Sequence, residues 1–195
     1  MQQRPVVSIF TIANIITALR ILVAPVFFFL LVQDAFWGYA WALILFIGAA
    51  LTDFVDGILA RYFGEISEFG IFLDPLADKI LVLSALFGFT WLDVLPLWMV
   101  SVVAVRDVIA TIIRVWSWSE GKSFSPSPLA KWKTFTQMGF VSAVLVLLAA
   151  EASPVRGISH WAAGVVSSGV IEGAMSIVVL LTIGSLLGYL RRIHF

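Results

Sequence analysis

The chain has 195 residues, of which 61% are hydrophobic and 12% charged, with a mean hydropathy of +1.04. This is far more apolar than an ordinary soluble domain, and it predicts a protein embedded in a lipid bilayer. The formal net charge is zero and there is no cysteine. No overall positive field therefore favours nucleic acid, and disulfides, thiolate metal sites and cysteine nucleophiles are excluded.

Six stretches approach the roughly twenty apolar residues that a helix needs to cross the hydrocarbon. We therefore expect an all-α, polytopic membrane protein with six transmembrane helices in one domain, 1–195. Short connections at 33–37 and 90–96 predict antiparallel neighbours. Residues 4–11, within the leading segment 1–11, are expected to form an interfacial helix, 120–133 a cytoplasmic loop and 153–168 an outer connection. The predicted spans are 12–32, 36–59, 72–91, 95–118, 135–150 and 170–190.

Lysine and arginine in the loops indicate the orientation, because cytoplasmic loops carry an excess of both. With the amino terminus in the cytoplasm, the outer loops hold only Arg156. We therefore predict a multi-pass protein of the cell membrane with both termini in the cytoplasm, and an active site on that side. The basic residues on the cytoplasmic side are Arg4, Arg61, Lys79, Lys122, Lys131, Lys133, Arg191 and Arg192.

Four aspartates, Asp53, Asp56, Asp74 and Asp78, occur in the run DFVDGILARYFGEISEFGIFLDPLAD. A charged side chain at a helix centre in the bilayer costs about 2.5 to 3.5 kcal/mol, so four acids need a compensating partner. Spacings of three and four place each pair on one helix face. Hard divalent cations prefer carboxylate oxygens and bridge them to phosphates, so the pattern predicts two ions that clamp a diphosphate. The alternative is a set of exposed acids in a loop.

Two neighbours of the aspartates favour a phosphate ligand. Gly57 removes a side chain beside the acids, so a phosphate can approach the backbone. Arg61 lies about one turn further and can neutralise a phosphate oxygen. Asn14 and Thr17 share a face of the first span, where they either contact the bound ligand or form hydrogen bonds between helices.

The whole motif resembles the signature of the CDP-alcohol phosphatidyltransferases. The resemblance implies transfer of a phosphatidyl group from a CDP-linked lipid to an alcohol, with release of CMP. It implies that the four aspartates hold two divalent cations, Mg²⁺ or Mn²⁺, and that Asp78 is also the general base. It further implies contacts of Gly57, Ala60, Arg61 and Ser67 with the cytidine diphosphate. The matching residues are Asp53, Asp56, Gly57, Ala60, Arg61, Gly70, Asp74 and Asp78.

The runs NIITALR, LDPLADKIL, VRDV and KWKTFTQM resemble the phosphatidylglycerophosphate synthases of that family. This resemblance implies CDP-diacylglycerol and sn-glycerol 3-phosphate as substrates, and a homodimer. The acceptor's phosphate then needs cations, and the candidates are Arg106, Arg114, Lys131 and Lys133. Many relatives carry a glycine where this chain has Ala130.

Three of these cations also have a simpler interpretation. Lys131 and Lys133 are then topology anchors or partners of anionic lipid head groups. Arg106 then pairs with an acid such as Asp107, because ionised residues inside a membrane protein normally pair.

Several alternative functions stay open at this point. Within the family, the acceptor is instead phosphatidylglycerol, as in cardiolipin synthases, or inositol phosphate or serine. Outside the family, the acids line the ion path of a cation transporter, or the chain is a lipid-binding scaffold. Gly57 and Arg61 disfavour the ion path, which needs no space for a phosphate and is hindered by a guanidinium.

Overall fold

The computed structural model describes the backbone of residues 12–63, 68–119 and 128–193, and the side-chain surroundings of 17–52, 79–113 and 132–186. Within these residues the chain forms seven α-helices and no strand, which confirms the all-α prediction. The helices are α1 (Ile12–Leu31), α2 (Phe36–Phe63), α3 (Glu68–Trp91), α4 (Leu97–Ser119), α5 (Pro128–Glu151), α6 (Arg156–Val166) and α7 (Val170–Ile193).

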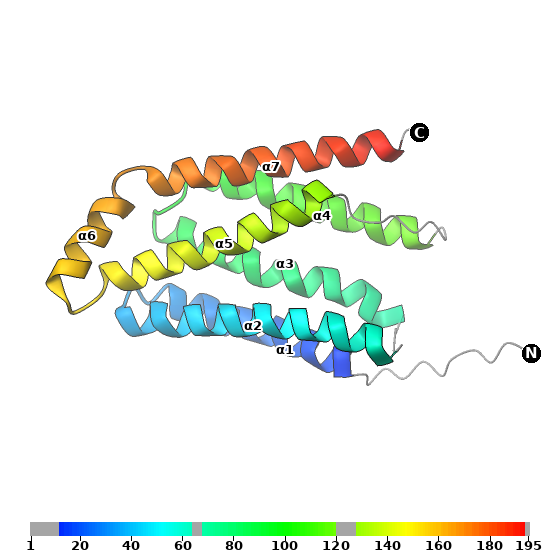
Figure 1. The fold of residues 1–195 in the computed structure, drawn as a ribbon, viewed down its shortest axis with the longest axis horizontal. Coiled ribbons are helices and arrows are strands. Elements are labelled where there is room, and N and C mark those ends of the chain that lie inside the picture. The colour runs from blue at the N-terminus through cyan, green and yellow to red at the C-terminus, as the bar shows by residue number, and fades with distance from the viewer. Residues whose placement is uncertain (1–11, 64–67, 120–127, 194–195) are drawn as a thin grey trace, which may run out of the picture.

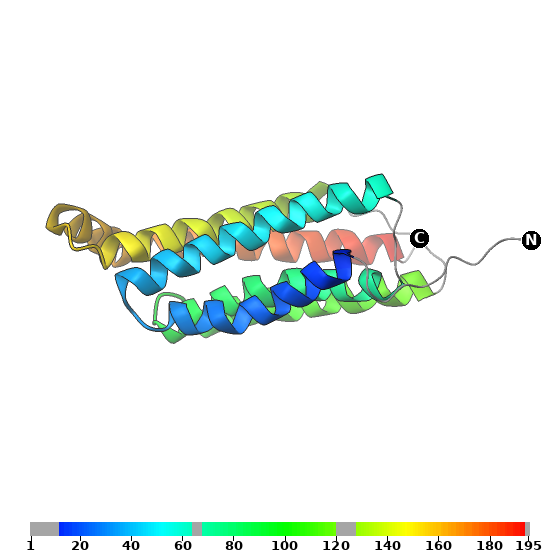
Figure 2. The ribbon, with the colours of Figure 1, turned by 90° about the horizontal axis from the view of Figure 1, so that it is seen from below.

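The long helices lie side by side in an elongated bundle, and the short helix α6 lies across one end of it (Figures 1 and 2). The end of α2 and the start of α3 lie at the opposite end from α6. The end opposite α6 also contains the start of α1, the end of α4, the start of α5 and the end of α7. Helix α1 packs against α2, and α3 packs against α4, as the short connections predict. Helix α1 also packs against α3, which the sequence did not predict.

Two parts of the predicted organisation need correction. The expected loop at 120–133 ends earlier, because α5 begins at Pro128, where the missing proline N–H leaves no helical hydrogen bond unmade. The outer connection at 153–168 contains helix α6, whose 11 residues are too few to cross a membrane and were therefore not predicted as a span. The predicted interfacial helix at 4–11 lies outside the described residues.

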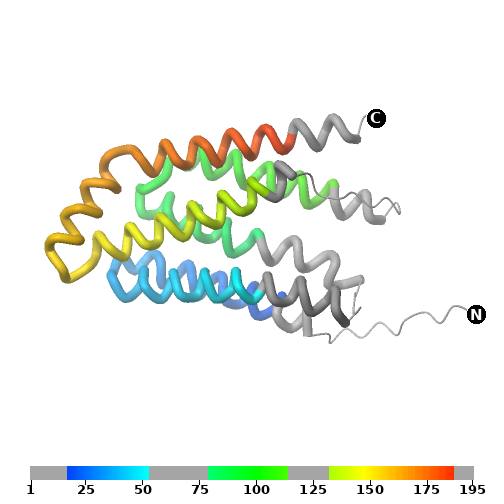
Figure 3. Tube along the Cα trace, viewed as in Figure 1, coloured from blue at the N-terminus to red at the C-terminus, as the bar shows by residue number. Residues whose placement is uncertain are grey.

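The described helices are strongly apolar, as expected of a membrane protein. Judged by length and composition, 132–151 can cross a membrane by itself, and α6 with 170–186, bent by 50°, passes if the two count as one span. Segments 17–31, 36–52 and 79–91 are apolar but shorter within the residues searched. The number of six spans therefore stays a prediction. These segments belong to the coloured part of the trace in Figure 3.

The bundle buries one continuous apolar core and also exposes large apolar side chains. Phe27, Phe46 and Phe89 are fully buried between the helices, whereas Phe29 and Leu180 are largely exposed. The many large apolar side chains exposed in the described residues suit contact with lipid better than contact with water.

Two glycines allow α1 to approach its neighbours closely. At Gly38 of α2, a Cβ atom would collide with the backbone carbonyl oxygen of Leu30. At Gly88 of α3, it would collide with the side chain of Leu31. Helix α1 is therefore held closely between the two helices that carry the aspartates.

Candidate active site

The aspartate motif occupies the end of α2 and the start of α3. Asp53 and Asp56 lie in α2, and Asp74 and Asp78 in α3, so the helical spacing of each pair is as predicted. Their side chains lie outside the described residues, and so do those of Gly57, Ala60, Arg61, Ser67 and Asn14. The metal and nucleotide sites therefore stay predictions. The part of the chain with described side chains contains no group of three or more acids or histidines suited to a metal.

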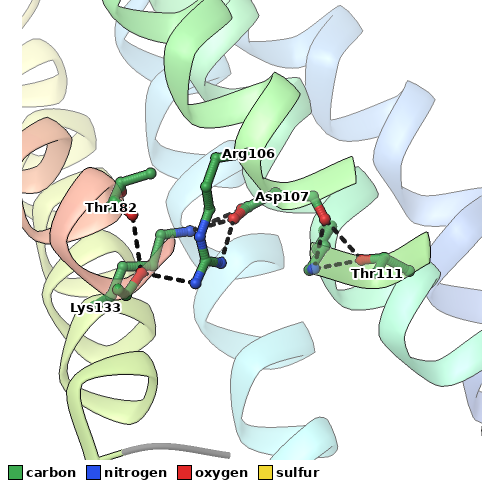
Figure 4. A network of polar contacts seen from close by, with 7 residues as sticks. Arg106, Asp107, Thr111, Lys133 and Thr182 are labelled. Atoms are coloured by element: carbon green, nitrogen blue, oxygen red, sulfur yellow. Dashed lines mark hydrogen bonds and ion pairs between the residues drawn. The ribbon is translucent and has the colours of Figure 1, made fainter. Parts of the chain in front are cut away.

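A buried polar cluster lies between α4 and α5. Lys133 Nζ of α5 donates to both carboxylate oxygens of Asp107 on α4, at 2.7 and 2.8 Å. Arg106 Nη1 donates to the same carboxylate at 3.0 Å. Lys133 and Asp107 are only 2% and 3% exposed. Figure 4 shows both cations converging on the one aspartate.

Arg106 also connects the cluster to the last helix. Its Nη2 donates to Ser185 Oγ of α7 at 2.7 Å, and that hydroxyl donates to the carbonyl oxygen of Thr182 at 2.9 Å. Arg106 Nε is buried and has no hydrogen-bond partner among the described residues. The guanidinium therefore keeps one donor that its present contacts do not use.

Lys79 reaches the same region from α3. Its Nζ donates to the backbone carbonyl oxygen of Asp107 at 2.9 Å and to Thr111 Oγ1. Thr111 Oγ1 in turn donates to that carbonyl at 2.8 Å. Lys79 follows Asp78 directly in the sequence, so these contacts join the helix of the predicted base to α4.

The charges of the buried triad do not balance. Arg106 and Lys133 bring two positive charges, and Asp107 brings one negative charge. Buried charges are costly unless they are paired, so the one positive charge that these three residues carry in excess would be stabilised by an anion nearby. A phosphate group meets this need, particularly since Arg106 Nε is available to donate.

The structure brings together two of the four predicted acceptor cations, Arg106 and Lys133. Both pair with Asp107, as the alternative interpretation of Arg106 expects. Lys133 faces the bundle interior and pairs with Asp107, whereas its neighbour Trp132 is 64% exposed, so the Lys133 side chain is not oriented as a lipid-facing anchor. The side chains of Arg114 and Lys131 lie outside the described residues.

Several further polar residues have interaction partners, and most of them were not predicted as site residues. Thr17 and Arg20 are buried on α1, and each has an interaction partner. Ser185 and Thr111 were not predicted, because a serine or threonine in an apolar helix usually bonds only to its own backbone. Lys79 was predicted only as a residue that sets the membrane orientation. No local sequence signal distinguishes these three residues.

Comparison with known proteins identifies the family. Residues 10–169 match the CDP-alcohol phosphatidyltransferase family, and the chain belongs to it. It is 37% identical over 149 residues to a CDP-diacylglycerol–glycerol-3-phosphate 3-phosphatidyltransferase of Bacillus subtilis, covering 70% of this chain and 77% of that protein. It is also 37% identical to a probable phosphatidylglycerophosphate synthase of Mycobacterium tuberculosis, covering 93% of this chain and 80% of that protein.

A relative with another name also matches. A CMP-forming cardiolipin synthase of Streptomyces coelicolor is 36% identical over 108 residues, which is 54% of this chain and 50% of that protein. The family resemblance inferred from the aspartate motif is thus confirmed, while the names of the relatives differ in the acceptor that they imply.

Proposed function

We propose that this protein transfers a phosphatidyl group from CDP-diacylglycerol to sn-glycerol 3-phosphate, giving phosphatidylglycerophosphate and CMP in phospholipid biosynthesis. Family membership supports the reaction type. The names of the Bacillus subtilis and Mycobacterium tuberculosis relatives, the latter aligned over almost the whole chain, favour glycerol 3-phosphate as the acceptor.

The observation that carries this proposal is the buried group of Arg106, Asp107 and Lys133. It holds one positive charge in excess and an unused donor at Arg106 Nε. Such a group suits an acceptor that brings its own phosphate, because the anion would offset the excess charge in a site of low dielectric. Arg114 and Lys131 are proposed to complete this acceptor site.

The aspartates are proposed to hold two divalent cations. Asp53 and Asp56 lie on one face of α2, and Asp74 and Asp78 on one face of α3. A donor set made only of carboxylates fits Mg²⁺ or Mn²⁺, which when bound would offset the charge of the diphosphate. The CDP-lipid would be held by Gly57, Ala60, Arg61, Ser67, Asn14 and Thr17.

Asp78 is proposed to act as general base. Its carboxylate takes the proton of the acceptor hydroxyl while that oxygen forms a bond to the phosphorus that carries diacylglycerol. The bond from this phosphorus to the bridging diphosphate oxygen breaks, and CMP leaves with that oxygen. Asp78 is followed by Lys79, which contacts the helix of Arg106 and Asp107, so the base belongs to the helix joined to the acceptor cations.

The proposed setting is a cell membrane crossed by six helices, with the aspartate motif and both termini in the cytoplasm and the protein acting as a homodimer. The arrangement in Figure 1 supports one part of this. The motif ends of α2 and α3 lie at the same end of the bundle as the start of α1 and the end of α7.

An acceptor screen tests the proposal. The purified chain is incubated with CDP-diacylglycerol, Mn²⁺ and one acceptor at a time, and CMP release is measured. Release with glycerol 3-phosphate is expected, and Asp78→Asn is the inactive control. Release only with phosphatidylglycerol would favour the second candidate, a cardiolipin synthase, to which the Streptomyces coelicolor relative points. Release only with inositol phosphate or serine would assign another branch.

A companion assay tests the transporter alternative. Ion flux through liposomes that contain the protein, without CDP-lipid turnover, would contradict the enzymatic proposal altogether.

A further inference from the structure

The side chain of Lys79 forms hydrogen bonds with α4. Its ammonium group donates to the Asp107 carbonyl oxygen at 2.9 Å and to Thr111 Oγ1, which lie 28 and 32 residues further along the chain. A lysine that only marks the cytoplasmic side of a membrane would extend toward water or lipid head groups. Lys79 instead joins two helices.

The two helices that it joins carry different parts of the proposed reaction centre. Helix α3 carries Asp74 and Asp78, and Asp78 directly precedes Lys79. Helix α4 carries Arg106 and Asp107. The side chain of Asp107 holds Lys133 and Arg106, while its backbone carbonyl receives Lys79. Asp107 therefore contacts Lys79 of α3 through its backbone and the two acceptor cations through its side chain.

We propose that Lys79 is a positioning residue, which together with Thr111 and the Asp107 carbonyl fixes the distance between the aspartate motif and the acceptor cations. This inference rests on the proposed function, because it assigns the base to Asp78 and the acceptor's phosphate to Arg106 and Lys133. A base must lie within hydrogen-bond reach of the hydroxyl. A misplacement of about 1 Å can lower a rate by about 100-fold.

Thr111 allows this role to be tested separately from metal or nucleotide binding. The hydroxyl of Thr111 lies on α4, outside the aspartate motif, and its described partners are Lys79 and the Asp107 carbonyl. Removing that hydroxyl should disturb the spacing of the two helices and leave the metal ligands unchanged. Thr90 offers a matched control, because its hydroxyl donates only to the backbone carbonyl oxygen of Leu86 in its own helix, α3, among the described contacts.

The kinetic test uses the full chain in detergent, with CDP-diacylglycerol, Mn²⁺ and glycerol 3-phosphate. For Thr111→Val we expect kcat to fall about 10-fold, and for Lys79→Met about 10- to 100-fold. Mn²⁺ affinity and KM for CDP-diacylglycerol should not change. Thr111→Ser should restore kcat, and Thr90→Val should leave it unchanged.

A second measurement reports the spacing without activity. The chain has no cysteine, so Phe87→Cys and Ile112→Cys place spin labels at exposed positions on α3 and α4. We expect the distance distribution between the labels to broaden or shift in Thr111→Val and Lys79→Met, but not in Thr90→Val.

The two failures can be distinguished. If the wild-type protein uses another acceptor, the proposed substrate is wrong, and the variants are compared with that acceptor. The positioning role is overturned if Thr111→Val retains the wild-type kcat and label distance. It is also overturned if Lys79→Met loses Mn²⁺ affinity, because Lys79 would then act within the metal site. If Lys79→Met does not fold, the pair Thr111→Val and Thr111→Ser decides.

Discussion

Lys133 Nζ lies 2.7 and 2.8 Å from the two carboxylate oxygens of Asp107, although 26 residues separate them in the chain. Both side chains are almost completely buried, and Arg106 Nη1 shares the same carboxylate at 3.0 Å. In such surroundings each partner depends on the other, because an unpaired charge would have to be held without water. This pair therefore joins α4 to α5 and also orients the cations proposed to bind the acceptor.

The first prediction concerns the coupling of Asp107 and Lys133. Asp107→Asn should lower the free energy of unfolding by about 3 to 5 kcal/mol, because it leaves two buried cations without their counter-charge. In a double-mutant cycle with Lys133→Met, the two changes should be non-additive by about 0.5 to 3 kcal/mol. Denaturant unfolding in detergent measures all four variants. Additive effects would show that the two residues do not stabilise each other.

A second prediction concerns recognition of the acceptor. Arg106→Gln should raise KM for glycerol 3-phosphate about 10- to 100-fold, since a hydrogen bond from a charged group contributes about 1.5 to 3 kcal/mol. KM for CDP-diacylglycerol should not change. Arg106→Lys keeps the positive charge but loses the planar fork of donors, so its KM for glycerol 3-phosphate should lie between those of the wild type and Arg106→Gln. Steady-state kinetics with each substrate varied in turn gives the comparison, and an equal rise in both KM values would refute an acceptor-specific role.

The third prediction separates base from metal ligand in the aspartate motif. Asp78→Asn should lower kcat by about 10² to 10⁴, the range typical of general-base catalysis, and keep much of the Mn²⁺ binding. Asp53→Asn should also weaken Mn²⁺ binding, because Asp53 is proposed only as a ligand. Titration with Mn²⁺, followed by electron paramagnetic resonance, measures the affinity. Chelation by EDTA should abolish turnover, and added Mg²⁺ or Mn²⁺ should restore it. Equal loss of Mn²⁺ binding in both variants would contradict the separate role of Asp78.

A fourth prediction uses two neighbouring hydroxyls of α7. Thr182 Oγ1 is buried and has no hydrogen-bond partner among the described residues, so Thr182→Val should raise stability by about 1 kcal/mol. Ser185 Oγ accepts from Arg106, so Ser185→Ala should lower stability by about 1 to 3 kcal/mol. Thermal unfolding in one detergent compares them. If Thr182→Val is the more destabilising change, the hydroxyl has a partner that the structure does not contain.

The last prediction concerns the close approach of α1 and α2. Gly38→Ala should lower stability by about 1 to 3 kcal/mol, because the new methyl group would meet the Leu30 carbonyl oxygen. Gly48→Ala is the matched control on the same helix, with nothing near its Cβ position. It should be neutral or raise stability by up to about 1 kcal/mol through reduced chain entropy. Equal melting temperatures of the two variants would mean that α1 can shift without cost.

Much of the fold follows from local sequence patterns. Long apolar stretches predict helices at the observed places, and α1, α2 and α7 begin at the predicted residues. Helix α6 and about the first two turns of α5 were missed, because a short or partly polar helix lacks the length on which that prediction depends. The aspartate motif identifies the family for a similar reason, since its spacing is local and needs no knowledge of packing.

Only the tertiary structure decides which polar residues meet. Each residue along an α-helix turns the side chain by about 100°, so the rotation of α5 alone determines that Trp132 faces outward and Lys133 inward. In a helix that is apolar all round, the sequence carries little information about this rotation. The partners of Lys79, Lys133 and Arg106 lie 28, 26 and 79 residues away. Family, helix order and the aspartate motif are therefore local properties of this sequence, whereas the buried cation group exists only because packing sets how each helix is turned.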